Sequence, residues 1–204
     1  MTNRRTFIKQ SGLLASGALL NLNFAEKEKL KLGLQLYTLN AEMSKNVLAT
    51  LKTVASFGYQ DVETSSYNYG KNKYYWGYKP QELKAILDDN NISSSSGHYD
   101  LNKFFDAPDD EMMKYVDDCI GGASILKQQY IVWPWLAPEF RSIEQMKVLS
   151  EKLNKIGERI KKANLQLAYH NHDFEFISHN GELGYDIILK NTDADLVKME
   201  MDLY

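Results

Sequence analysis

Short apolar stretches alternate along this chain with longer segments whose apolar residues recur every three or four positions. The short stretches are typical of strands and are found at residues 30–37, 59–64, 92–98, 130–135, 165–172 and 196–204. The longer segments are typical of amphipathic helices and are found at residues 44–57, 81–89, 109–125, 142–163 and 185–191. This regular exchange predicts a parallel sheet whose strands are joined by helical crossovers.

The first predicted helix shows how its ends and its buried face follow from the sequence. Ser44 can accept a hydrogen bond from a free backbone N–H at the start, and Gly58 can end the helix. We expect its buried stripe to consist of Val47, Leu48, Leu51, Val54 and Ala55.

One stretch, residues 163–176, combines apolar alternation with a concentration of chemically active side chains. It reads A-N-L-Q-L-A-Y-H-N-H-D-F-E-F, and His170 and His172 lie two positions apart on one face of the predicted strand. Only four histidines occur in the 204 residues. We therefore interpret this stretch as the strand that carries the active site, the alternative being two ordinary hydrogen-bonding histidines at a strand end.

Polar or aromatic residues also lie near the end of each of the remaining predicted strands. The ends of successive parallel strands meet at one edge of a sheet, so these side chains are expected to form a ring around one mouth. Its members are Gln35, Glu63, His98, Trp133, His170, His172 and Asp202.

An aromatic segment at residues 65–79 follows the second predicted strand. It contains five tyrosines and Trp76. Aromatic faces stack on the C–H faces of sugar rings, so this segment predicts sugar recognition. The alternative is a loop that folds over a small core of its own.

Composition narrows the classes of protein that need to be considered. The hydrophobic content of 44% and charged content of 25% are typical of a globular chain with one good-sized core. The net charge of -3 and the absence of a basic patch in the region after residue 25 argue against a nucleic-acid partner. Cys119 is the only cysteine, which excludes an intramolecular disulfide and a thiolate metal cluster.

The N-terminal segment, residues 1–25, predicts export through the twin-arginine pathway. Arg4 and Arg5 precede Thr-Phe-Ile-Lys and a mildly apolar segment rich in Gly, Ala, Ser and Leu. A frayed basic tail is the alternative, but it would not require the apolar segment. Cleavage after Ala25 would release residues 26–204 into the periplasm, whereas an uncut form would remain tethered to the membrane.

Four stretches together resemble the sugar phosphate isomerase/epimerase family, which comprises xylose-isomerase-like TIM barrels. They are G-Y-Q-D-V-E at 58–63, L-N-K-I-G-E at 153–158, Y-H-N-H-D-F-E-F at 169–176 and M-E-M-D-L-Y at 199–204. The resemblance covers nearly all of residues 26–204, and the Y-H-N-H-D-F-E-F run is its most specific part. It implies a (β/α)₈ TIM barrel, of which this chain supplies the first six strands.

The resemblance also implies a function and a set of site residues. Relatives bind one divalent metal and move a proton beside a sugar carbonyl, which implies a metal-dependent sugar isomerase or epimerase. Asp202 matches the strand-six ligand, and His170 lies at the strand-five ligand position, where relatives often have glutamate. Imidazole in place of carboxylate favours Mn, Co or Zn over Mg.

The remaining site residues are assigned on the same basis. Glu175 is expected to be the base, with His172 and Glu63 as further catalytic residues. Gln35, His98, Trp133 and Trp76 are expected to bind the sugar. An unphosphorylated sugar is favoured, because the chain contains no Gly-rich phosphate loop and its N-terminus predicts export.

The ligands that relatives carry on strands seven and eight have no counterpart before Tyr204. The sequence therefore predicts a truncated barrel that binds metal weakly and is inactive as given, unless a second chain supplies those strands.

Two rival functions remain open. A 3-keto-glycoside lyase or hydratase would cleave glycosides, and a non-catalytic carbohydrate-binding barrel would be insensitive to His170→Ala. Glycosidase chemistry would require Glu63 and Glu175 to face each other.

Overall fold

A computed structural model describes residues 31–68 and 74–203 of the chain. Within these residues, six strands form one parallel sheet, and each strand is hydrogen-bonded to the next in chain order. The strands are β1 (Gly33–Gln35), β2 (Asp61–Thr64), β3 (Ser93–His98), β4 (Tyr130–Trp133), β5 (Gln166–His170) and β8 (Val197–Glu200). The prediction of a parallel sheet is confirmed, with each strand shorter than its apolar stretch.

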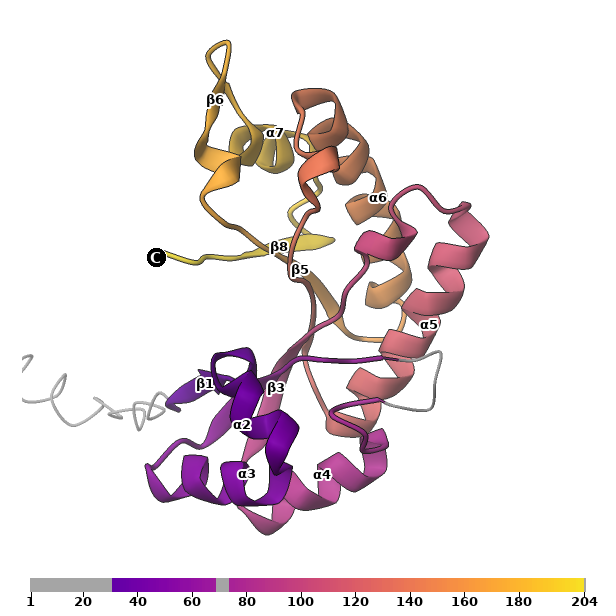
Figure 1. Cartoon of the computed structure of the whole chain (residues 1–204). Coiled ribbons are helices and arrows are strands. Elements are labelled where there is room, and N and C mark those ends of the chain that lie inside the picture. The colour runs from indigo at the N-terminus through magenta and orange to yellow at the C-terminus, as the bar shows by residue number, and fades with distance from the viewer. Residues whose placement is uncertain (1–30, 69–73, 204) are drawn as a thin grey trace, which may run out of the picture. The chain divides into compact units, whose positions relative to one another are not determined.

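Helices connect the strands and lie along the outer face of the curved sheet (Figure 1). They are α2 (Asn40–Lys45), α3 (Val47–Ser56), α4 (Pro80–Asp89), α5 (Asp109–Leu126), α6 (Ile143–Lys161) and α7 (Gly184–Asn191). Figure 1 also shows a hairpin, β6 (Ser178–His179) with β7 (Glu182–Leu183), between β5 and α7. The alternating strand and helix order is that of a partial (β/α)₈ barrel.

Local side chains explain where these helices begin. The Asn46 side chain accepts a hydrogen bond from the Ala49 backbone N–H at 3.0 Å and caps α3. Ser142 does the same for α6 by accepting from the Gln145 N–H at 3.2 Å. The expected single helix from Ser44 is therefore two helices, because the extended backbone of Asn46 separates α2 from α3.

The core lies between the outer face of the sheet and the helices. Its fully buried aliphatic and sulfur-containing side chains come from both layers and include Leu51, Leu83, Met112, Leu149, Leu153, Ile156, Ile160, Leu167 and Ile188. Of the buried stripe expected for the first helix, Val47, Leu51 and Val54 are buried. Leu48 was expected there too but is 53% exposed, because it lies on the outward side of α3.

Strand β3 is rich in serine and is buried through polar contacts in place of apolar ones. The Gln128 side-chain amide donates to Thr64 Oγ1 and Ser94 Oγ, at 2.8 Å each. Tyr99 donates to Gln128 Oε1 at 2.7 Å. A Cβ on Gly97 would lie 2.5 Å from Thr64 Oγ1, so only glycine fits beside this network.

The pairing of β2 with β3 changes register between Val62 and Glu63, so that Ser95 has no partner in β2. Irregularities of this kind bend a strand and re-aim the side chains beside it, and they are frequent next to active sites. Glu63 is the residue that follows the change.

The predicted signal segment, residues 1–25, lies outside the described residues. In the part of the chain that the structure describes, no helix is both long enough and apolar enough to cross a bilayer.

Candidate active site

A cavity of about 920 Å³ lies at the carboxyl ends of the strands. We call it the strand-end cavity. A second space of about 610 Å³, the interior cavity, follows the inner face of the sheet. Gln35, Glu63 and Glu200 line both cavities, so the polar cluster stands where they meet. A pocket of this size at this edge of a parallel barrel is where substrates bind in the fold.

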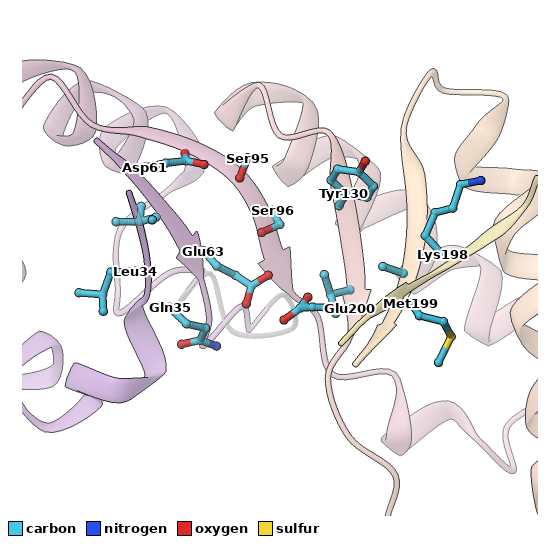
Figure 2. Close-up of a pocket in the computed structure, with 14 residues that line it drawn as sticks. Leu34, Gln35, Asp61, Glu63, Ser95, Ser96, Tyr130, Lys198, Met199 and Glu200 are labelled. Carbon is cyan, nitrogen blue, oxygen red and sulfur yellow. The ribbon is translucent and has the colours of Figure 1, made fainter. Parts of the chain in front are cut away.

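Figure 2 shows the interior cavity from β1, β2 and β3 on one side to β5 and β8 on the other. The carboxylates of Glu63 and Glu200 are turned toward each other between the two groups of strands, with Gln35 beside them. Strands far apart in the sequence therefore contribute to one cluster.

Two histidines connect these carboxylates. His98 Nε2 lies 2.9 Å from Glu63 Oε1 and 3.4 Å from Glu200 Oε1. His170 Nδ1 lies 3.0 Å from the same Glu200 oxygen. The rings of His98 and His170 meet edge to face, with their centres 5.2 Å apart. Glu200 thus accepts from two imidazoles that come from different strands.

The cluster continues to Asp202 and Gln35. His170 Nε2 lies 3.6 Å from Asp202 Oδ2, and Gln35 Nε2 lies 3.0 Å from His98 Nδ1. The side-chain amide of Asn171, which is fully buried, donates to the Asp202 carbonyl at 3.0 Å and accepts from the Asp202 N–H at 3.2 Å. The asparagine between the two histidines of the H-N-H sequence therefore ties the end of β5 to the end of β8.

The shared hydrogen bonds change the acidity of the cluster. Burial alone would raise the pKa of Glu200, but the hydrogen bonds from His170 and His98 outweigh it and hold that pKa below its usual range. Burial would lower the pKa of His98, but hydrogen bonds to Glu200 and Glu63 raise it to about 9. Glu200 is consequently ionised at neutral pH.

His172 lies at the edge of the cluster and lines the strand-end cavity. Its ring is stacked on Phe174, and its pKa is lowered by burial and by the nearby His170 and Arg141. Nδ1 of His172 is buried without a hydrogen-bond partner among the described residues. The part of this imidazole that lines the cavity is suited to contacting a ligand there.

Six of the predicted site residues come together here. Those that line the strand-end cavity are Gln35, Glu63, His98, His170, His172 and Asp202. Glu200 was not among the predicted site residues. Its position two residues before Asp202, on the same face of β8, is the sequence signal that could have found it.

Three other expectations differ from the structure. Glu175, expected as the base, is 0% exposed, and its two oxygens accept hydrogen bonds from the Tyr169 hydroxyl at 2.6 Å and the His172 N–H at 2.8 Å. It therefore fixes the turn after β5 instead of facing the cavity. Trp133, expected to bind sugar, is also 0% exposed, because its indole packs on Phe105 and donates to the Trp135 carbonyl.

The aromatic segment at 65–79 also differs from its sugar-binding prediction, although residues 69–73 lie outside the described residues. Tyr75 is fully buried and Tyr67 nearly so, and their rings pack on Tyr99 and on each other. Trp76 is half-buried against this core and is absent from the residues that line the strand-end cavity. Trp135, at 41% exposure, is the tryptophan that lines it.

Comparisons with known proteins define the fold. No family model matches the chain, and no curated protein matches it in sequence. Two solved structures of sugar phosphate isomerase/epimerases from Parabacteroides distasonis ATCC 8503 are similar to it, at 24% and 26% identity with TM-scores of 0.75 and 0.72. The alignments cover 86% and 88% of this chain and 70% of each of those chains.

A xylose isomerase-like TIM barrel protein from Mycobacterium smegmatis, solved in complex with magnesium, is similar at 12% identity with a TM-score of 0.58. That alignment covers 85% of this chain and 64% of that chain. The chain therefore has the fold of the xylose isomerase-like TIM barrels, and its structural neighbours include sugar phosphate isomerase/epimerases.

Proposed function

We propose that this protein is a metal-dependent isomerase or epimerase that moves a proton beside the carbonyl group of a small sugar. The observation that carries this proposal is the cluster of two histidines and three carboxylates, His98, His170, Glu63, Glu200 and Asp202, at the boundary of a sugar-sized cavity.

The donor groups fit a divalent metal. His170 Nε2 and Asp202 Oδ2 lie 3.6 Å apart, a separation that two ligands of one ion can have. His170 directs its other nitrogen to Glu200, and such a carboxylate behind a histidine is the usual support of a metal ligand. A metal held there would polarise the sugar carbonyl and so acidify the neighbouring C–H.

The other residues would handle the substrate and the proton. The carboxylate of Glu63 lines both cavities and is held by His98, so it is placed to accept a proton from a sugar in the strand-end cavity. His172 faces the same cavity from β5. Glu63 replaces Glu175 as our candidate base, because Glu175 is buried away from the cavity.

The test is isotope exchange. The chain is incubated in deuterium oxide with unphosphorylated aldoses, ketoses and oxidised sugars, with and without added Mn²⁺, Co²⁺, Zn²⁺ or Mg²⁺. Because the described strands already assemble the cluster, we expect metal-dependent incorporation of deuterium beside the carbonyl, reduced about 100-fold or more in Glu63→Gln. Such exchange would overturn the inactivity that the sequence predicts for this chain. If the chain binds a sugar but catalyses no exchange with any of the four metal ions, the proposal is refuted and the non-catalytic carbohydrate-binding barrel is supported. A parallel incubation with a 3-keto-glycoside tests the lyase, which would cleave the glycosidic bond.

We also propose that the protein is exported through the twin-arginine pathway and acts in the periplasm. The support is the arginine pair and the mild apolar segment within residues 1–25. A reporter fused behind these residues should be exported, and replacement of Arg4 and Arg5 by lysine should abolish export. Unchanged export of the lysine variant would contradict the proposal.

A further inference from the structure

The amide of Gln35 has only one orientation that satisfies its neighbours. Its Oε1 accepts a hydrogen bond from the Tyr37 backbone N–H. A backbone N–H can only donate, so the oxygen of the amide must be on that side. The NH₂ group is then the part that lies 3.0 Å from Nδ1 of His98.

This orientation determines the tautomer of His98. Because the Gln35 NH₂ donates, Nδ1 of His98 must accept and carries no proton in the neutral ring. The ring proton is therefore on Nε2. The groups that face Nε2 agree with this assignment, because Glu63 at 2.9 Å and Glu200 at 3.4 Å are both carboxylates that can only accept when ionised.

The same reasoning passes through Glu200 to His170. Glu200 Oε1 lies 3.0 Å from Nδ1 of His170, so this nitrogen carries the proton of the neutral ring. The lone pair of His170 is then on Nε2, which lies 3.6 Å from Asp202 Oδ2.

We propose that Gln35 is a positioning residue that holds His98 as the Nε2–H tautomer, so that His170 alone of the two offers a nitrogen lone pair to the metal. His98, His170 and Glu200 place ligand atoms within 4.8 Å of one another and could by distance alone hold an ion together. Nε2 of His98 carries a proton in this tautomer and in the imidazolium form alike, and that proton opposes such an arrangement in either form. His98 instead donates to Glu63 and Glu200 and orients both carboxylates.

The inference deepens the proposed metal site, but it can be tested without turnover. Long-range ¹H–¹⁵N correlation spectra of the ¹⁵N-labelled chain distinguish protonated from bare ring nitrogens. Spectra recorded above the pKa of the His98 ring should show a bare Nδ1 and a protonated Nε2, and the reverse pattern would overturn the proposal. Zn²⁺ is added as a diamagnetic probe to a separate sample at neutral pH. His98 Nε2 should keep its proton while Nε2 of His170 shifts, whereas loss of the proton from His98 Nε2 would contradict the assignment.

The variant that tests Gln35 itself is Gln35→Glu. A carboxylate accepts where the amide donated, so a proton should appear on Nδ1 of His98. Gln129→Glu is the matched control, since Gln129 is exposed and lies at the opposite end of the sheet. It should leave the His98 spectrum unchanged. A bare Nδ1 in a folded Gln35→Glu variant would show that Gln35 does not set the tautomer of His98. If that variant does not fold, the wild-type spectra decide the question.

Discussion

At the scale of single residues, the site depends on which hydrogen-bonding group each side chain has available. Glu200 accepts from His98 and His170, and each of these rings then has one other nitrogen whose partner differs. Nδ1 of His98 faces an amide donor, whereas Nε2 of His170 faces the carboxylate of Asp202. Two chemically identical side chains are thereby suited to different roles.

Removal of His170 should abolish binding of Zn²⁺ at the proposed site, because His170 supplies its nitrogen lone pair. Titration calorimetry of His170→Ala measures this directly. His179→Ala is the control, since His179 is an exposed histidine on the β6–β7 hairpin and should bind as the wild type does. Equal loss in both variants, or in neither, would contradict the assignment.

Glu200→Gln should weaken Zn²⁺ binding by roughly 10–100-fold without abolishing it. The glutamine keeps the shape of the side chain but removes the charge that orients His170, and losses of this order follow removal of a supporting carboxylate. Competition with a chromophoric chelator gives the affinity. An affinity equal to that of wild type would show that Glu200 does not support the metal site.

At the scale of elements, close approach of backbones sets how helices and strands are joined. Gly157 of α6 lies against Leu196, just before β8. A Cβ at Gly157 would be 2.8 Å from the Leu196 carbonyl oxygen. The glycine of the L-N-K-I-G-E stretch is thus required by contact between α6 and the chain that leads into the site strand.

Gly157→Ala should destabilise the fold by about 1–3 kcal/mol, because the added methyl group forces α6 away from Leu196. Gly121→Ala in α5 is the matched control. A Cβ there has nothing within 4 Å, so the alanine should leave stability unchanged or raise it by up to about 1 kcal/mol through helix propensity. Thermal unfolding of both variants is the measurement, and similar melting temperatures for the two would contradict the prediction.

At the scale of the whole molecule, the free energy of unfolding includes contributions from buried groups that do not face the cavity. Glu175 is one of them, because burial raises the pKa of its carboxyl even though the Tyr169 hydroxyl and the His172 N–H act in the opposite direction. A pKa raised in the folded state means that the folded protein binds more protons than the unfolded chain between the two pKa values. The contribution of Glu175 to stability therefore falls as pH rises through that window.

Glu175→Gln should remove this contribution. The unfolding free energy of the wild type should exceed that of the variant most at pH values below about 4.3, the pKa of a glutamate in the unfolded chain. The excess should decrease as pH rises. Urea unfolding at several pH values measures it. A difference that grows with pH would show that the ionised carboxylate is the form that the fold stabilises.

Local pattern was sufficient for the elements and for most of the ring of polar side chains. The strands, the start of α6 at Ser142, and the positions of Gln35, Glu63, His98, His170 and Asp202 near strand ends follow from local alternation and hydrogen-bonding chemistry. The cap of α3 does not, because it is Asn46 and not the expected Ser44. Parallel strands then bring these ends together whatever their separation in sequence. The parallel sheet needed no more than this, whereas the isomerase-like barrel was implied by the resemblance of four sequence stretches to a known family.

Tertiary packing decided which of those residues face the cavity and what their nitrogens and oxygens can do. Glu175 and Trp133 also lie close to strand ends, but contacts with Tyr169 and Phe105 respectively keep them buried. The tautomer of His98 depends on Gln35, which is 63 residues away in sequence and adjacent only after the sheet has formed. Sequence alone thus determined which residues stand at strand ends, whereas burial and hydrogen bonding between distant residues, set by the sheet, decided their chemistry.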